Sequence, residues 1–430
     1  MPRRSSRAHP ISRPTWPPLR PPDPLPLDWV VKNVLTRFPE VHAKHRAYLS
    51  ALERTPQARA FDDPTVSVMV DNEPTRGMTA GNDPDTMIEL SQKFPSPGKR
   101  ALRAEISERE ADLVFLEALE HHLELQWQAS QAYFDYLLAD QRVEMLENQR
   151  RLFEAYAPAV KARSHRTLAT PRDLFIDAAR TNTRLLKYRQ DRRAAMLKLN
   201  TLMGRNWEAP LTRPVVEELS DLPGDREALA AEVFNKSIAA RAVRIRIKRA
   251  DADKQLADKG KVPDFTLFGR YTVAGDALMD DSVRVGVSMN IPLTGRADHR
   301  VAEATHELAR WQDEQRAVNT QIVRDIALLH EQALSQRDSF RYYEQDILPR
   351  MRQLSSTAFA TYQAGRSDIV QLLEMQEGLL NAELEALDMR VAYEKTLTDI
   401  TRLTATLPPY AVKQMSERPL NTPRDPRGKK

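Results

Sequence analysis

The chain has 430 residues, with 64 basic and 60 acidic side chains, a net charge of +4 and no cysteine. The near balance of charge disfavours a dedicated nucleic-acid-binding protein, which concentrates positive charge on one surface. The lack of cysteine excludes disulfides, thiolate metal ligands, cysteine nucleophiles and a lipid-modified N-terminal cysteine. With 13 glycines and 29% charged residues, the composition is typical of long helices in contact with water.

The two ends of the chain are rich in proline and basic residues, and we predict that residues 1–26 and 408–430 are disordered. The N-terminal segment contains no apolar core of about 7–15 residues, so no signal peptide is visible in this sequence. Nowhere does the chain reach the roughly 18–20 consecutive apolar residues that predict a membrane-spanning helix.

The first half of the chain, residues 27–204, is predicted to combine three helices with one pair of strands. Apolar residues spaced by three and four predict helices at about 27–59, 98–166 and 174–203. Val66, Val68 and Val70 alternate with polar residues, and so do Ile88 and Leu90, which predicts strands at about 64–72 and 85–94. A turn near 166–173 separates the two later helices, and Gly204 is expected to end the third helix.

A proline-rich linker, 205–224, leads to a second half, 225–407, that repeats the same order of elements. Helices are predicted at about 225–259, 296–362 (bent at Pro349) and 368–407, with a turn near 362–368. Strands are predicted at about 264–273 and 282–292. In the sequence VRVGVSMNIPL (283–293), valines, Met289 and Ile291 alternate with Arg284, Gly286, Ser288 and Asn290, which predicts a strand with one apolar and one polar face.

The predicted lengths match between the two halves. At about 1.5 Å per residue, each long helix would measure roughly 100 Å, and the shorter helices match it when stacked in pairs. Four strands cannot close a barrel, which needs about eight, and open apolar edges aggregate. Because a membrane strand needs about 9–11 residues with alternating polarity, three copies could supply twelve strands and close the wall. A small soluble sheet beside a plain coiled coil remains an alternative.

The order of the elements resembles the outer-membrane efflux proteins, the TolC-like exit ducts of Gram-negative bacteria. The resemblance covers about residues 27–407. It is carried by the duplicated unit and by VGVSMNIPLTGR (285–296), YQAGRSDIVQLLEMQEGLLNAELE (362–385) and FPEVHAKHRAYLSA (38–51). The segment SPGKR (96–100) is similar to the branch that serves heavy-metal cation pumps.

The resemblance implies a mainly α fold with a small β part, assembled as a homotrimer. A 12-stranded outer-membrane β-barrel, with four strands per chain, would continue into a long α-helical periplasmic barrel of roughly 100 Å. The valines of 283–293 would then face lipid, and Arg284, Ser288 and Asn290 would face water. The implied partners are a periplasmic adaptor (membrane fusion) protein, an inner-membrane pump of the RND type and outer-membrane lipid, with no nucleic acid. The chain would be a passive conduit.

The resemblance also places function at the two helical turns. Family members narrow the duct with acidic side chains on the helix after the second turn, and the matching positions are Asp368, Gln371 and Glu374. A ring of such carboxylates would select cations. The candidates for adaptor contact are Gly365, Arg366 and Ser367 at the second turn, and Thr170, Pro171, Arg172 and Asp173 at the first. The alternative interpretation is a pair of ordinary helix–helix turns in which Asp173 and Asp368 cap the following helices.

Neither catalysis nor a cofactor is expected. No nucleophile elbow, phosphate loop or dinucleotide fingerprint is present in the sequence. No histidine pair stands four residues apart with a carboxylate partner, so no metal site is expected. The chief alternative function is a soluble helical scaffold or adaptor-like interaction protein without a membrane barrel. A third hypothesis is a degenerate duct that no longer reaches the membrane.

Overall fold

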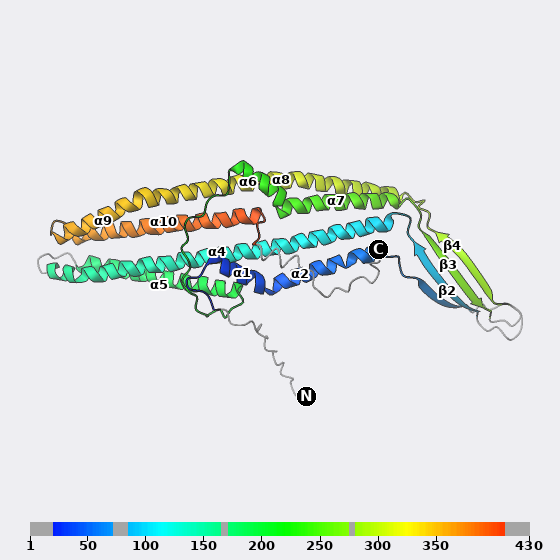
Figure 1. The fold of residues 1–430 in the computed structure, drawn as a ribbon, viewed down its shortest axis with the longest axis horizontal. Coiled ribbons are helices and arrows are strands. Elements are labelled where there is room, and N and C mark those ends of the chain that lie inside the picture. The colour runs from blue at the N-terminus through cyan, green and yellow to red at the C-terminus, as the bar shows by residue number, and fades with distance from the viewer. Residues whose placement is uncertain (1–19, 72–84, 165–170, 275–279, 409–430) are drawn as a thin grey trace, which may run out of the picture. The chain divides into compact units, whose positions relative to one another are not determined.

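The computed structural model describes residues 20–71, 85–164, 171–274 and 280–408 (Figure 1). The chain divides into two compact units. Unit 1 comprises residues 1–41, 122–229 and 325–430, and unit 2 comprises 42–121 and 230–324. Each sequence repeat contributes segments to both units. Most of the two predicted disordered ends, 1–19 and 409–430, lies outside the described residues.

Unit 2 contains one antiparallel sheet of four strands in the order β1-β2-β3-β4. The strands are β1 (Thr65–Asp71), β2 (Asp85–Phe94), β3 (Phe265–Val273) and β4 (Ser282–Met289). β2, β3 and β4 are drawn side by side in Figure 1. The two hairpins predicted about 200 residues apart therefore form a single sheet, in which Val68 pairs with Ile88 and Leu267 pairs with Val287.

The two faces of this sheet differ in chemistry, as the alternation predicted. One face exposes apolar side chains from all four strands, among them Val68, Leu90, Leu267 and Val285. The other face carries polar groups, including an ion pair of 2.6 Å between Arg270 Nη2 and Glu89 Oε2 on neighbouring strands. The predicted fold class, mainly α with a small β part, is confirmed.

The helices of unit 2 include α2 (Pro39–Leu52), α3 (Arg54–Arg59) and α7 (Ile238–Lys259), with the first parts of α4 (Lys99–Ser164) and α8 (Arg296–Tyr342). Unit 1 contains α1 (Leu27–Arg37), α5 (Pro171–Leu202), α9 (Leu348–Gln363) and α10 (Ile369–Leu403), with the later parts of α4 and α8. α6 (Arg226–Lys236) begins in unit 1 and ends in unit 2, and the first three residues of α2 also belong to unit 1. The largest core cluster of unit 1 joins α1, α4, α5 and α10 around Val34, Leu125, Leu199 and Val391.

Two helices predicted as continuous are interrupted. The helix predicted at 27–59 consists of α1, α2 and α3. The break between α1 and α2 falls at Phe38, which precedes Pro39 and takes an extended conformation (φ −69°, ψ 122°). A residue before proline is sterically excluded from the helical region. The helix predicted at 225–259 consists of α6 and α7, separated at Ser237 (φ −52°, ψ 134°).

The long helix predicted at 296–362 also has an interruption, but not where it was expected. Tyr343–Ile347 form a π-helical turn between α8 and α9, whereas Pro349 lies in the first turn of α9. Since proline has no N–H to offer the helix, a widened turn before it accommodates the missing hydrogen bond. Gly204, with φ +65°, follows the end of α5 as predicted.

Ordered structure begins closer to the N-terminus than predicted. Leu25 is fully buried, and it forms a parallel bridge with Pro214 of the linker. The backbone N–H of Leu25 donates to Arg213 O at 2.7 Å, and Val215 N donates back to Leu25 O at 2.9 Å. The prediction of disorder for 1–26 is thus wrong for its last few residues. Among the described helices, none combines the length and the apolar character that crossing a membrane requires.

Candidate functional site

The second helical turn, 364–368, connects α9 to α10 in unit 1. Gly365 has φ +78°, a conformation that glycine adopts without steric cost. The N–H of Arg366 donates to Thr361 O at 2.9 Å, which satisfies a terminal carbonyl of α9. Asp368 then caps α10, because its Oδ1 accepts a hydrogen bond of 2.6 Å from Ile369 N. The predicted cap at Asp368 is confirmed.

The three positions predicted for the constriction lie at the start of α10. Asp368, Gln371 and Glu374 are all exposed, and their spacing of three places them along one side of the helix. Ile369, Leu372 and Leu373 are buried on the other side. In a single chain these polar groups are therefore available to solvent, and whether they form a ring stays a prediction.

A buried polar contact lies one turn further along α10. The Nε2 of Gln376 donates to Ser355 Oγ on α9 at 2.7 Å and to Tyr156 Oη on α4 at 3.2 Å. Gln376 is only 6% exposed, and Tyr156 stacks on Phe359 with ring centroids 5.1 Å apart. Burial raises the pKa of the Tyr156 hydroxyl, so that it stays protonated. One amide thereby fixes the positions of three helices next to the turn.

Sequence reasoning did not single out Gln376. A signal was present, because this glutamine follows Leu372 by four residues and precedes Leu380 by four, which places it on the apolar side of the helix. A polar residue at such a position needs a buried partner. The identity of the partners depends on α4 and α9 and is not visible in the sequence of α10.

The first helical turn is only partly described. Thr170 lies outside the described residues. α5 begins at Pro171, a favoured first helical residue, so Arg172 and Asp173 fall within its first turn. Asp173 is therefore not the residue before the helix, and the predicted capping position is wrong.

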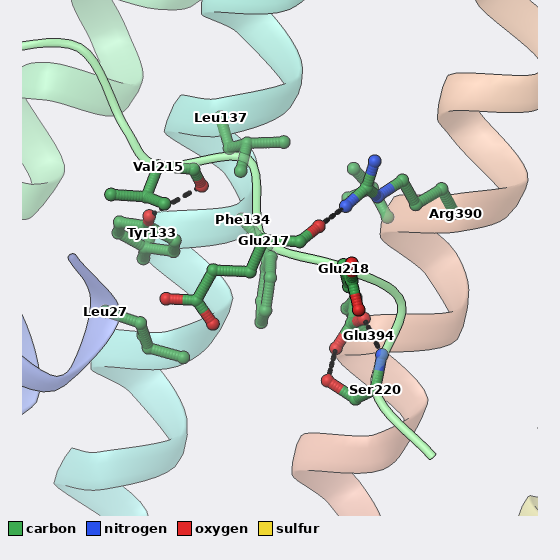
Figure 2. A pocket seen from close by; sticks show the side chains of 11 residues that line it. Leu27, Tyr133, Phe134, Leu137, Val215, Glu217, Glu218, Ser220, Arg390 and Glu394 are labelled. Atoms are coloured by element: carbon green, nitrogen blue, oxygen red, sulfur yellow. Dashed lines mark hydrogen bonds between the residues drawn. The ribbon is translucent and has the colours of Figure 1, made fainter. Parts of the chain in front are cut away.

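A cleft in unit 1 lies where the linker crosses α4 and α10 (Figure 2). The Oη of Tyr133 donates to Val215 O at 3.1 Å and to Leu25 O at 3.0 Å. Ser220 donates from its N and Oγ to the two carboxylate oxygens of Glu394, at 3.0 and 2.9 Å. Arg390 donates to Glu217 O. These contacts hold the linker against both helices.

The cleft also brings together Glu217, Glu218 and Glu394. Ser220 donates to the carboxylate of Glu394, and Arg390 donates to the backbone oxygen of Glu217. Among the residues that the structure describes, no group of three or more His, Cys, Asp or Glu side chains is arranged to hold a metal ion.

Comparisons with known proteins find a matching family model, a related sequence and solved structures with the same fold. Residues 231–406 match the family model described as outer membrane efflux protein. The cobalt-zinc-cadmium resistance protein CzcC of Cupriavidus metallidurans is 22% identical over 352 residues, which is 81% of this chain and 82% of that protein.

Solved structures give the same fold at low identity. The outer membrane protein VceC of Vibrio cholerae superposes with a TM-score of 0.73 at 17% identity, covering 88% of this chain and 96% of VceC. The open-state outer membrane channel MtrE of Neisseria gonorrhoeae gives a TM-score of 0.70 at 15% identity, covering 88% of each chain. The resemblance of this chain to the outer-membrane efflux proteins, predicted from its sequence, is thereby confirmed by family model, relative and fold.

Proposed function

We propose that this chain is the outer-membrane channel of a tripartite efflux system, a passive exit duct. An inner-membrane pump of the RND type and a periplasmic adaptor deliver the substrates. Three copies join their four-stranded sheets into a 12-stranded barrel, and their helices continue the duct into the periplasm. The family match and the channel fold support this assignment.

One observation carries the proposal: the apolar face of the sheet has no cover within the described chain. Val283 and Val285 are 73% and 75% exposed, and the neighbouring strands expose more apolar side chains on the same face. Each Å² of apolar surface left in water costs about 25 cal/mol, and water-soluble monomers rarely expose such a continuous patch. Lipid is the environment that stabilises this face, which favours the channel over a soluble helical scaffold.

The cargo is set largely by the pump. The similarity to a cobalt-zinc-cadmium resistance protein favours heavy-metal cations as substrates. The exposed carboxylates of Asp368 and Glu374, with Gln371 between them, would line the narrow end of the duct and attract cations. Gly365, Arg366 and Ser367, with Thr170, Pro171, Arg172 and Asp173 at the other turn, would contact the adaptor.

The first experiment measures the mass of the detergent-extracted protein by light scattering. We expect about three times the 49.1 kDa of one chain, corrected for bound detergent. The scaffold hypothesis expects a monomer or dimer that stays in solution without detergent. That result would overturn the channel assignment.

The second experiment tests the constriction by single-channel conductance in planar bilayers. We expect Glu374→Gln to lower the preference for cations over anions, because it removes a carboxylate from each copy. Glu344→Gln is the matched control, since Glu344 is also exposed but lies in the π-helical turn between α8 and α9, away from the turn at 364–368. Equal selectivity in the two variants would exclude Glu374 from the ring.

A further inference from the structure

We propose that Arg296 of one copy of this chain forms an ion pair with Asp63 of the next copy, at the base of a seam in which β4 pairs with β1. The partner is a second copy of the same chain, and the inference rests on the proposed trimeric channel. It specifies the register of the three seams and the charged pair that fixes each of them.

The sheet has two open edges that match each other. β1 and β4 each pair on one side only, because the order is β1-β2-β3-β4. Both edges expose apolar side chains, such as Val66 and Val68 on β1 and Val287 and Met289 on β4. All neighbouring strands are antiparallel, so β4 and β1 run in opposite directions and can continue the ladder. An uncovered apolar edge is a template for pairing with another chain.

The contact between the two hairpins of one chain provides a template for the seam. Lys99, the first residue of α4, places Nζ 2.7 Å from Asp264 Oδ1 and 2.8 Å from Val262 O. The same Asp264 oxygen accepts from Ser96 N at 2.8 Å. The two side chains are only 7% and 12% exposed. Burying two charges costs free energy, and their attraction offsets that cost only in a defined geometry. The pair therefore fixes the position of β2 relative to β3.

The internal repeat predicts an equivalent contact at the open edges of the sheet. FPSPGKR (94–100) aligns with IPLTGRA (291–297), which places Arg296 on Lys99, each the first residue of its helix. Gly98 and Gly295 coincide in this alignment, and both have positive φ, +91° and +66°. The two hairpins therefore enter their helices through equivalent turns.

The acidic partner follows from the strand registers. The same alignment places Ser91 on Ser288, and these residues pair with Thr65 and Thr266. Thr65 is thus equivalent to Thr266, and two residues earlier Asp63 is equivalent to Asp264. Asp63 and Arg296 are both exposed, and within the described part of the chain neither forms an ion pair.

The template also sets the register of the seam. Leu90 pairs with Gly269 inside the chain. Val287 is equivalent to Leu90 and Val68 is equivalent to Gly269, so Val287 should lie opposite Val68 of the next copy. By the same rule Met289 lies opposite Val66. Apolar side chains then meet on the same face of the sheet. The alternative is to align Pro64 with Pro263 while keeping the register within each hairpin. In that case Ile291 would lie opposite Val68, four residues beyond Val287.

Cysteine pairs test the register directly, since the chain has no cysteine of its own. We expect Val68→Cys/Val287→Cys to yield a covalent trimer on a non-reducing gel, and the matched Val68→Cys/Ile291→Cys to yield none. Bonds within one chain are excluded, because three strand spacings of about 4.8 Å exceed the roughly 7 Å that a disulfide spans. A covalent trimer from the second pair, or from neither pair in a trimeric sample, overturns the register. A monomer by light scattering overturns the channel itself.

Charge reversal tests the ion pair. We expect Arg296→Glu or Asp63→Arg alone to lower the fraction of trimer that resists detergent gels by several fold. The combination Arg296→Glu/Asp63→Arg should restore it, whereas Arg296→Glu/Asp62→Arg should not. Failure of the first combination to restore the trimer, with cross-linking intact, overturns the pair while leaving the register.

Discussion

Removing the ammonium group of Lys99 should destabilise unit 2 severely, although the side chain lies beyond the ends of the central strands β2 and β3. The change Lys99→Met keeps the length of the side chain but leaves the Asp264 carboxylate with one donor, Ser96 N, at a position only 12% exposed. Removing one partner of a buried ion pair costs about 3–5 kcal/mol, because the remaining charge stays out of water. We expect a loss of that size in the free energy of unfolding.

The assay is a urea titration of the detergent-solubilised protein, followed by circular dichroism. Lys261→Met is the matched control, since Lys261 pairs with Asp298 at 2.9 Å while both side chains are largely exposed. An exposed pair of this kind contributes little, so its loss should be barely measurable. The double variant Lys99→Met/Asp264→Asn should be more stable than Lys99→Met alone, because it contains no buried charge. Equal effects of Lys99→Met and Lys261→Met would show that the buried pair contributes no more to stability than the exposed pair.

Three further predictions concern unit 1, each measured as a change in the free energy of unfolding. Gln376→Leu should cost about 1–3 kcal/mol, because it deletes two buried hydrogen bonds. The control Gln371→Leu changes an exposed side chain and should be nearly neutral. Equal losses in the two variants would show that the buried contact contributes nothing to stability. Tyr133→Phe should cost about 0.5–1.5 kcal/mol by releasing the linker, and no loss would remove Tyr133 as an anchor. Asp399→Asn should increase stability at neutral pH but not in acid, and a loss at neutral pH would contradict this prediction.

The sign of the Asp399 effect follows from its environment. Burial raises the pKa of this carboxyl in the folded chain, against the opposing hydrogen bond of 2.5 Å from Trp127 Nε1 and the charge of Arg402. A raised folded pKa favours the protonated acid, so stability is highest below the unfolded pKa and falls as pH rises through the folded pKa. Asparagine mimics the protonated form and should abolish this dependence, which titrations of unfolding against pH would reveal.

Local patterns in the sequence predicted elements well where one physical rule dominates. Alternation of valines with polar residues predicted β1 and β4, since side chains of a strand point to opposite faces. β4 ends at Met289, three residues before the predicted end, and Pro292 itself has no N–H to donate to a ladder. The break at Phe38 was predictable from Pro39 in principle, but apolar spacing across it concealed the interruption.

Contacts between distant segments could not be predicted in the same way. The pairing of β2 with β3 joins residues about 180 positions apart, such as Glu89 and Arg270, and no local rule links them. The partners of Gln376 come from α4 and α9, and those of Tyr133 come from the linker and from the segment before α1. Such contacts depend on which helix faces which.

Local patterns of residues were enough to predict the duplicated plan of this protein: the strand pairs, the long helices, the turns between them and the resemblance to an efflux family. Those features depend on period, on glycine and proline, and on order along the chain, all of which are local. The folded structure was needed to show that the two hairpins share one sheet and that Lys99 is buried against Asp264. It was also needed to show that the apolar face and both sheet edges stay uncovered within the described chain. Burial and pairing depend on distances between remote residues, and only the folded chain sets those distances.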